Sequence, residues 1–429
     1  MKYVIVGNSA AAVGCITGIR RVDKESPITV ISYESSCYSK PMIADVLIDI
    51  PEEKLIYRDE SFFKENGVEL ILGHRAVKVN PDSKVVVLDS NELVPYDRLL
   101  ISTGARPFVP PIPGVDKEGV FTFTELSSAL AFKDYIKRNS VEDVIVVGAG
   151  FIGLEVAYFL AKLGVKVTVV ELLERALAKA LDERSSQIVE SLMEEEGVNF
   201  IFKDKVDEIL GDERVASVKL GSGKVLKADA VVMAVGVRPN TQLAETAGVE
   251  VGVGVKTAPS METSVKDIYA AGDCVECLDV TDGQTKPLPL FPLAFEQGFI
   301  AGLNMAGKAT NYLGGLPLNS LKFLPTPVLN AGIVTPPDSS YEVLINDRFR
   351  DKGFYRKAVL KDGRLVGFVA VGHIDRVGVL TNLIRQKIDV SDVKDRLVEL
   401  DFGLVDLPQW WREEKLKRDK TAYEDWRAV

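Results

Sequence analysis

The sequence predicts an α/β protein with two doubly wound, parallel-sheet domains and a smaller α/β domain at its C-terminal end. Its 429 residues suit about three domains, since one domain takes about 150 residues. Two segments, 3–21 and 144–163, each run from a short apolar strand through a glycine-containing turn into a helix. This order is typical of a buried parallel strand and its crossover helix. After residue 307, alternating strands at 354–360 and 364–371 flank a Lys-Asp-Gly turn and indicate the third domain.

The composition excludes several classes of protein. Hydrophobic residues make up 46% of the chain and charged residues 27%, as in ordinary globular proteins. The formal charge of −10 disfavours a nucleic-acid partner, which would need a basic face. Two histidines are too few for a histidine-rich metal site, and we expect no metal. Four cysteines in so long a chain indicate a reducing compartment and no apolar run could span a bilayer, so we expect a cytoplasmic protein.

The second strand–turn–helix segment carries a complete dinucleotide-binding fingerprint. Gly148, Gly150 and Gly153 follow the strand at 144–147; they permit a tight turn, close approach of a pyrophosphate and close helix packing. Glu171 ends the next strand, where a carboxylate accepts hydrogen bonds from both ribose hydroxyls and repels a 2′-phosphate. The sequence therefore predicts a nicotinamide dinucleotide site that prefers NADH to NADPH.

The first segment departs from this fingerprint. Gly7 is kept, but Ser9 and Ala12 stand where the second and third glycines are expected. Alanine is tolerated at the third position, whereas serine at the second adds bulk where a pyrophosphate approaches. Taken alone, the segment fits either a dinucleotide-binding loop or a structural turn.

Two further apolar strands end in glycine and complete the pattern. One starts at residue 99 and leads to Thr103 and Gly104; the other starts at residue 268 and leads to Gly272 and Asp273. The Asp273 carboxylate can accept a hydrogen bond from a sugar-like hydroxyl. With the two strand–turn–helix segments, their order resembles the FAD-dependent pyridine nucleotide-disulfide oxidoreductase family, most strongly over residues 1–307. The chain is most similar to rubredoxin-, ferredoxin- and nitrite reductase-type NADH flavoproteins and to FAD subunits of anaerobic iron-sulfur oxidoreductase complexes.

The resemblance implies a division of the chain and its cofactors, FAD and NAD. An FAD domain would comprise residues 1–112 and 240–307, with an NAD domain at 113–239, both Rossmann-like; a C-terminal domain at 308–403 and a charged, tryptophan-rich tail at 404–429 would follow. Within the FAD domain, the first glycine turn would face the pyrophosphate, Glu34 the adenosine ribose and Asp273 the ribityl chain. The full set of implied cofactor-binding residues is Gly7, Ser9, Ala10, Ala12, Glu34, Lys40, Pro41, Thr103, Gly104, Ala105, Gly148, Gly150, Ile152, Gly153, Glu171, Gly236, Gly272, Asp273, Phe295 and Gln297.

The resemblance also implies two catalytic residues. Glu155 matches an acid that relatives place beside the nicotinamide and the flavin, although an ion-paired helix glutamate would give the same pattern. Relatives often carry a lysine after the proline that corresponds to Pro41, but Asp45 stands at that position. We expect Lys40 to take the place of this lysine.

The cysteines distinguish between branches of the family. No C-x4-C pair follows the first segment, and residues 38–43 resemble the Y-[SG]-R-P segment of electron-transfer flavoproteins, with Pro41 at the redox-cysteine position. Cys37 lies four residues before Pro41. Cys274 and Cys277 form a C-x2-C, which without a second pair or a nearby histidine cannot complete a tetrahedral metal site. We expect Cys274 to pack behind Asp273.

The resemblance implies an FAD-dependent NADH:acceptor oxidoreductase, in which a hydride passes between nicotinamide C4 and flavin N5. The expected acceptor is an electron-carrier protein or an iron-sulfur subunit of a larger complex. Two alternatives stay open: an NADH oxidase or coenzyme A disulfide (thiol) reductase that uses Cys37, and a flavin-bound redox-sensing scaffold.

The tail at 404–429 carries all three tryptophans of the chain amid densely mixed charge. Tryptophan and arginine are frequent interface anchors, which favours docking of a partner subunit or a second copy of the chain through the C-terminal domain and tail. Alternatively, the tail packs its tryptophans onto its own C-terminal domain.

Overall fold

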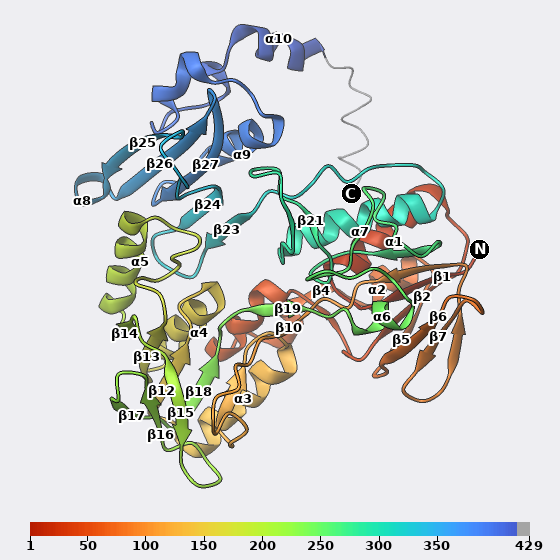
Figure 1. The fold of residues 1–429 in the computed structure, drawn as a ribbon, viewed down its shortest axis with the longest axis horizontal. Coiled ribbons are helices and arrows are strands. Elements are labelled where there is room, and N and C mark those ends of the chain that lie inside the picture. Colours follow the sequence, from red (N-terminus) through yellow and green to blue (C-terminus); the bar gives the residue numbers. More distant parts are fainter. Residues whose placement is uncertain (418–429) are drawn as a thin grey trace. The chain divides into compact units, whose positions relative to one another are not determined.

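The computed structural model describes residues 1–417 and divides them into two compact units (Figure 1). The first unit comprises Met1–Leu177 and Val189–Gly315; the second comprises Ala178–Ile188 and the chain from Leu316 onward. The short segment Ala178–Ile188 thus belongs to a different unit from the residues on either side of it.

The first parallel sheet of the first unit has the strand order β20-β9-β1-β2-β5. Its strands are β1 (Tyr3–Val6), β2 (Ile28–Ser32), β5 (Val68–Leu72), β9 (Arg98–Ile101) and β20 (Ile268–Ala270). Strand β1 is buried along its whole length, as expected for a parallel strand covered on both faces. The glycine turn after β1 leads into helix α1 (Ala10–Val22), as the sequence predicts.

The second parallel sheet repeats this plan with the order β11-β18-β12-β13-β14. Its strands are β11 (Val120–Thr122), β12 (Asp143–Val147), β13 (Lys166–Glu171), β14 (Val198–Phe202) and β18 (Ala230–Met233), and its helices are α3 (Leu126–Asn139), α4 (Phe151–Lys162) and α5 (Glu183–Glu195). The first residues of α5 fall in the second unit.

Smaller elements complete the first unit (Figure 1). Two antiparallel three-stranded sheets consist of β6 (Ala76–Asn80), β7 (Val85–Leu88) and β8 (Leu93–Pro95), and of β15 (Val206–Leu210), β16 (Ser217–Leu220) and β17 (Val225–Lys227). The remaining pieces are β3 (Cys37–Tyr38) paired with β4 (Ile56–Arg58), β21 (Cys277–Leu278) paired with β22 (Thr285–Lys286), the helices α2 (Glu60–Glu65), α6 (Gln242–Thr246) and α7 (Phe291–Met305), and the 3-10 helices η1 (Lys40–Ile48) and η2 (Glu52–Leu55).

The two chain crossings between the parallel sheets form one antiparallel ribbon. Strands β10 (Ala105–Pro107) and β19 (Val237–Pro239) pair so that Arg106 stands opposite Arg238. The crossings lie near residues 112 and 239, where the resemblance implies domain boundaries, but the sequence does not predict their pairing. Proline is tolerated here because the ribbon has two edges and no central strand.

Helices α1 and α7 approach each other backbone to backbone. A Cβ atom on Gly14 would lie 2.1 Å from the carbonyl oxygen of Phe295, and one on Gly302 would lie 2.2 Å from that of Cys15. Gly18 and Gly298 are equally close to the opposite backbone. Only glycine fits at these four positions, which we call the glycine seam. The seam fixes α7 against the helix that follows the first glycine turn.

The second unit is built on the antiparallel sheet β23-β24-β27-β26-β25. Its strands are β23 (Leu318–Leu321), β24 (Val328–Gly332), β25 (Glu342–Arg348), β26 (Phe354–Lys361) and β27 (Arg364–Val371); its helices are α8 (Phe349–Lys352), α9 (Val377–Gln386), α10 (Gln409–Lys417) and the 3-10 helices η3 (Ser391–Arg396) and η4 (Leu404–Asp406). The predicted hairpin of β26 and β27 is confirmed. Arg356 is buried on β26, where its guanidinium donates to the backbone oxygens of Glu399, His373 and Asp375.

The predicted fold class is confirmed, with two parallel sheets flanked by helices and a third, smaller α/β part. No helix within residues 1–417 has the length and apolar character needed to cross a membrane.

Candidate functional site

The second glycine turn has the geometry that its fingerprint predicts. Gly148 has a φ of +105°, and a Cβ atom there would lie 2.5 Å from the carbonyl oxygen of Ala234. A Cβ atom on Gly153 would lie 2.1 Å from the carbonyl oxygen of Gly148. By contrast, a Cβ atom on Gly150 would meet nothing within 4 Å. The first and third glycines are thus required by packing, and the second leaves open the place where a pyrophosphate would approach.

Glu171 lies at the end of β13 beside this turn. Its carboxylate accepts hydrogen bonds from the backbone N–H of Ala149 at 2.7 Å and of Leu173 at 2.8 Å. These bonds place a negative charge directly at the turn. Ile152 is 37% exposed on the first turn of α4, whose N-cap Gly150 offers no side chain to the helix amides. These amides are therefore available to a phosphate.

Gly236 follows β18 near the second glycine turn. Its φ is +108°, a conformation that favours glycine, and a Cβ atom there would meet nothing within 4 Å. The neighbouring chain is tied to β10, because Phe108 donates its backbone N–H to the Gly236 oxygen at 2.9 Å.

The first glycine turn meets similar packing constraints. Gly7 has a φ of +112°, and a Cβ atom there would lie 2.2 Å from the carbonyl oxygen of Ser102. Ser9 occupies the N-cap of α1 without a side-chain hydrogen bond to the helix, while Ala10 and Ala12 are buried. The first amides of α1 are thus left to another acceptor, as in the second turn.

Asn8 is a residue of this turn that the sequence reasoning missed. It is only 4% exposed, yet its Oδ1 has no hydrogen-bond partner among the described residues. Buried polar atoms are nearly always paired, so an unpaired one beside a glycine turn fits a missing ligand. The signal in the sequence was a polar residue between Gly7 and Ser9.

Glu34 follows β2 and is bonded to Tyr38. The Tyr38 hydroxyl donates to the Glu34 carboxylate and accepts the backbone N–H of Leu126, the first residue of α3, at 3.2 Å. Beside this group, the Tyr33 hydroxyl donates to Glu125, the N-cap of α3, at 2.6 Å. Glu34 is therefore held in place by Tyr38, which in turn contacts α3, a helix of the second parallel sheet.

The turn after β9, which contains Thr103 and Gly104, is held by Asn240, the residue after β19. Thr103 donates its hydroxyl to the backbone oxygen of Asn240 at 2.6 Å, and Asn240 Nδ2 donates to the backbone oxygen of Thr103 at 3.0 Å. Gly104 has a φ of +67° and open space at its Cβ position, and Ala105 begins β10. These contacts bring Thr103 and Gly104 to the start of the ribbon.

The turn after β20 is supported from α7. Gln297 is 1% exposed, and its amide oxygen accepts the backbone N–H of Gly272 at 2.8 Å. Burial raises the pKa of the adjacent Asp273 carboxyl, and the positive charge of Lys40 opposes this rise. Phe295, two residues earlier on α7, packs against the core and contributes its backbone to the glycine seam.

Lys40 and Glu155 lie on elements that pack together. Lys40 begins η1, and Glu155 lies on α4, where it is partly buried. Helix η1 contacts both α3 and α4. Their direct pairing, and their role in catalysis, stay predictions.

Together these turns lie at the carboxyl ends of two parallel sheets, and both glycine turns have the geometry expected of a dinucleotide-binding loop. Within residues 1–417, no cluster of three histidine, cysteine or acidic side chains is arranged to hold a metal ion. Residues 1–298 match the family model described as "Pyridine nucleotide-disulphide oxidoreductase". The chain belongs to this family. Residues 317–388 match the model of the rubredoxin NAD+ reductase C-terminal domain.

Members of the pyridine nucleotide-disulphide oxidoreductase family are oxidoreductases that bind FAD and NAD(P)H, so the expected family, enzyme class and cofactors are confirmed. The residues of both glycine turns fit these cofactors. Gly150 leaves open space for a ligand, and the Asn8 Oδ1 can accept a hydrogen bond from one.

Three known proteins of this kind illustrate the range of the family. The nitrite reductase [NAD(P)H] of Bacillus subtilis (strain 168) is 32% identical over 399 residues, which cover 91% of this chain and 48% of the relative. The chain thus spans about half the length of that relative. The epsilon subunit of the NADH-dependent phenylglyoxylate dehydrogenase of Aromatoleum evansii is 30% identical over 419 residues, or 96% of this chain and 98% of the subunit. The solved structure of an NAD-dependent persulfide reductase from A. fulgidus has a TM-score of 0.84 and 28% identity over 92% of this chain and 78% of that chain.

Disulfide chemistry gives the family its name, but the cysteines of this member are buried and unpaired. Cys37 is 2% exposed on β3, and burial raises its pKa to about 12. Burial likewise raises the pKa of Cys274 and of Cys277 to about 11. Pro41, the second residue of η1, is exposed. A thiol with so high a pKa is protonated near neutral pH and is a poor nucleophile.

Proposed function

We propose that the chain is an FAD-containing oxidoreductase that passes electrons between NADH and an electron-carrier protein or iron-sulfur subunit. The observation that carries this proposal is the state of Cys37, which is buried and has a pKa raised to about 12, while Pro41 stands at the position expected for a redox cysteine. Without an available thiol, electrons have no covalent relay in the chain and would leave from the flavin itself.

The proposed division of labour follows the two loops. Residues 1–112 and 240–307 would hold FAD, with the first glycine turn at the pyrophosphate, Glu34 at the adenosine ribose and Asp273 at the ribityl chain. Residues 113–239 would hold NAD, and 308–403 and 404–429 would be the C-terminal domain and tail. FAD, when bound, accepts a hydride from NADH and releases electrons one at a time. The protein contributes binding, orientation and exclusion of water.

The nucleotide preference is proposed from Glu171. Its carboxylate is fixed beside the second glycine turn by two backbone N–H groups, at 2.7 and 2.8 Å. A 2′-phosphate would bring a second negative charge to the same place, so NADH is favoured over NADPH. Glu155 on α4 and Lys40 on η1 are proposed to lie at the reacting rings.

The proposed partner is a second subunit of a dehydrogenase complex. In support, the Aromatoleum evansii relative is named as a subunit of an NADH-dependent dehydrogenase and is matched over 96% of this chain. The tail also offers exposed apolar groups, since Leu404, Val405 and Trp410 are 53%, 76% and 55% exposed. Trp411 is buried against its own chain at 6%, and Trp426 lies outside the described residues. The four unpaired cysteines support a cytoplasmic location.

Anaerobic titration with NADH tests this function. The holoenzyme should take up two electrons per FAD, and C37S should reduce a dye or a ferredoxin at the wild-type rate. Uptake of four electrons, or loss of turnover in C37S, would instead support a coenzyme A disulfide (thiol) reductase that uses Cys37, or a persulfide reductase, as the A. fulgidus neighbour is named. Rapid turnover with O2 alone would support an NADH oxidase. Negligible flavin reduction by NADH would support the third alternative, a flavin-bound redox-sensing scaffold.

A further inference from the structure

The segment after Glu171 is anchored in its middle and at its C-terminal end. We call residues 172–181 the ribose loop. Within the first unit, Leu177 donates its backbone N–H to the carbonyl oxygen of Ala149 at 3.0 Å, and Ala176 donates to the Glu190 carboxylate at 2.8 Å. The ribose loop is thus bonded to the middle of the second glycine turn.

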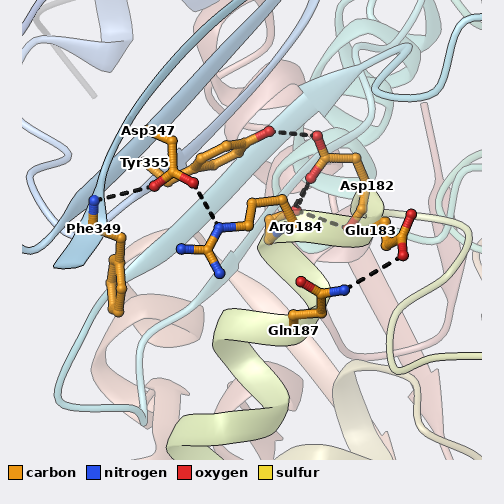
Figure 2. A network of polar contacts seen from close by, with 8 residues as sticks. Asp182, Glu183, Arg184, Gln187, Asp347, Phe349 and Tyr355 are labelled. Atoms are coloured by element: carbon orange, nitrogen blue, oxygen red, sulfur yellow. Dashed lines mark hydrogen bonds and ion pairs between the residues drawn. The ribbon is translucent and has the colours of Figure 1, made fainter.

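The loop ends at Asp182, which belongs to the second unit. Figure 2 shows the Asp182 carboxylate facing the Tyr355 hydroxyl. Asp182 is 8% exposed. Its Oδ2 accepts the Tyr355 hydroxyl at 2.6 Å and lies 2.9 Å from Lys357 Nζ, both on β26. Its Oδ1 accepts the backbone N–H of Ser185 at 3.0 Å and thereby caps α5. We call Asp182, Tyr355 and Lys357 the Asp182 clamp.

The clamp is a buried, charged contact with little tolerance for change. Burial alone would raise the pKa of the Asp182 carboxyl, but the bonds from Ser185, Tyr355 and Lys357 outweigh burial and lower it. The carboxylate therefore stays charged and bonded at neutral pH. Removal of one partner would leave a buried charge or acceptor unpaired. Nearby, Arg184 Nε pairs with Asp347 Oδ2 at 2.7 Å, but this pair is about one-third exposed and replaceable by water (Figure 2).

Only residues 178–181 separate Leu177, bonded to the glycine turn, from Asp182. A chain reaches at most about 3.5 Å per residue, so such a short link transmits a displacement of one end to the other. We propose that the Asp182 clamp is a positioning element for the nicotinamide dinucleotide: it sets the conformation of the ribose loop, and so couples NADH affinity to the C-terminal sheet. This inference rests on the proposed function, because it concerns the same nucleotide site. Asp182, Tyr355 and Lys357 touch no reacting atom and are positioning residues.

The clamp also gives a partner a route to the site. A subunit that docks on the C-terminal domain and shifts β26 would change the bonds of the Asp182 clamp and hence the affinity for NADH. By linkage, NADH would change the affinity for that subunit by the same factor. The coupling uses this chain's own hydrogen bonds and needs no new ligand.

The test uses D182N, Y355F and the double variant D182N/K357M in the holoenzyme, with R184A as the matched control. The D182N side chain keeps an oxygen that accepts the Ser185 N–H, so the N-cap of α5 is retained. Its amide NH2 faces the Tyr355 hydroxyl and the Lys357 ammonium, which are both donors, so the bonds of the clamp are lost. The double variant also removes the charge that D182N would leave unpaired. We expect the NAD dissociation constant, measured by calorimetry, and the KM for NADH to rise about 5- to 20-fold. The kcat with a dye at saturating NADH and the FAD content should stay within about twofold, and R184A should match wild type.

Hydrogen exchange supplies a readout that does not depend on turnover. NAD should slow amide exchange in β26 and in residues 178–188 of the wild type and of R184A, but not of D182N. The proposal is overturned if folded Y355F or D182N/K357M binds NAD as wild type does, or if weaker binding always comes with loss of FAD. Failure of the wild type to bind NAD would overturn the proposed function instead.

Discussion

The amide oxygen of Gln297 on α7 accepts the backbone N–H of Gly272 at 2.8 Å, in a place where Gln297 is only 1% exposed. This bond sets the turn that presents Asp273 at the end of β20. A buried N–H that loses its acceptor costs about 1–3 kcal/mol.

We therefore expect Q297M, which keeps the length of the side chain but removes the acceptor, to bind FAD about 5- to 100-fold more weakly than wild type. FAD content after gel filtration and the dissociation constant from flavin fluorescence measure the effect. Q297E, which keeps an acceptor oxygen, is the control. Equal FAD retention in Q297M and wild type would show that the turn holds its shape without this bond.

Substitution of Glu171 should change the choice of nucleotide. The carboxylate next to the glycine turn disfavours a 2′-phosphate by about 1–3 kcal/mol, so wild type should be reduced about 10- to 100-fold more efficiently by NADH than by NADPH. E171Q keeps a similar shape without the charge and should narrow this ratio about tenfold. Stopped-flow reduction of the flavin by each nucleotide gives the two efficiencies. A ratio that E171Q leaves unchanged would argue against electrostatic selection by Glu171.

The glycine seam should not accept a methyl group. The Cβ atom of G302A would lie 2.2 Å from the Cys15 carbonyl oxygen, so α1 and α7 would have to separate. Such overpacking costs about 1–3 kcal/mol or more, and because α7 carries Gln297, FAD should also be lost. G378A in α9 is the control, since its Cβ atom would meet nothing within 4 Å and the change should stabilise the helix by about 0.5–1 kcal/mol. Thermal unfolding monitored by circular dichroism compares the two.

Acid should weaken the first unit through Asp267, the residue before β20. Burial alone would raise the pKa of Asp267, but Lys84 at 2.7 Å and Arg98 at 3.1 Å outweigh burial and lower it. A carboxyl with a lowered folded-state pKa contributes stability above its unfolded pKa, about 4, and loses it as the pH falls through the folded value. The Tm of wild type should therefore exceed that of D267N at pH 7, and the two should converge below about pH 4. A difference in Tm that is constant from pH 7 to pH 3 would contradict this assignment.

The two adjacent tail tryptophans should have different roles. Trp411 is 6% exposed and Trp410 is 55% exposed. W411A should lower the Tm, because burial of a large aromatic ring is lost. W410A should leave the Tm unchanged and weaken binding of the partner subunit or of a second copy, as measured by co-purification and analytical ultracentrifugation. If W410A lowers the Tm as much as W411A, the tail belongs to the core of its own chain.

Local sequence signals predicted the parallel sheets and the glycine turns, because the residues that carry these features are close in the chain. Gly148, Gly150 and Gly153 lie on one turn; packing requires the first and the third to be glycine, and the second leaves open space. The apolar runs of β1 and β12 are buried on both faces of their sheets, and a continuous apolar run of this length predicts a parallel strand. The roles of the site residues remain predictions, since they depend on ligands.

Contacts between distant residues could not be predicted in this way. Tyr355 is 173 positions away from Asp182, and nothing near either residue marks the other as its partner. Thr103 and Asn240 are likewise 137 positions apart, and their pairing could not be predicted from the sequence around either residue. The glycine seam had a signal, a spacing of four between glycines on both helices, but one sequence does not show which helices meet.

The pairing of β10 with β19 has a consequence for how this enzyme can be rebuilt. The segment between Pro107 and Val237 leaves and rejoins the rest of the first unit through neighbouring strands, because these two residues stand opposite each other in the ribbon. A segment whose ends are adjacent can be exchanged for another of the same fold without a new linker, provided that the replacement keeps the contacts of Leu126 with Tyr38 and of Asp182 with Tyr355. We therefore expect the nucleotide preference to be exchangeable as a unit: a segment with a different preference, joined at these two positions, should leave the first parallel sheet and the glycine seam as they are.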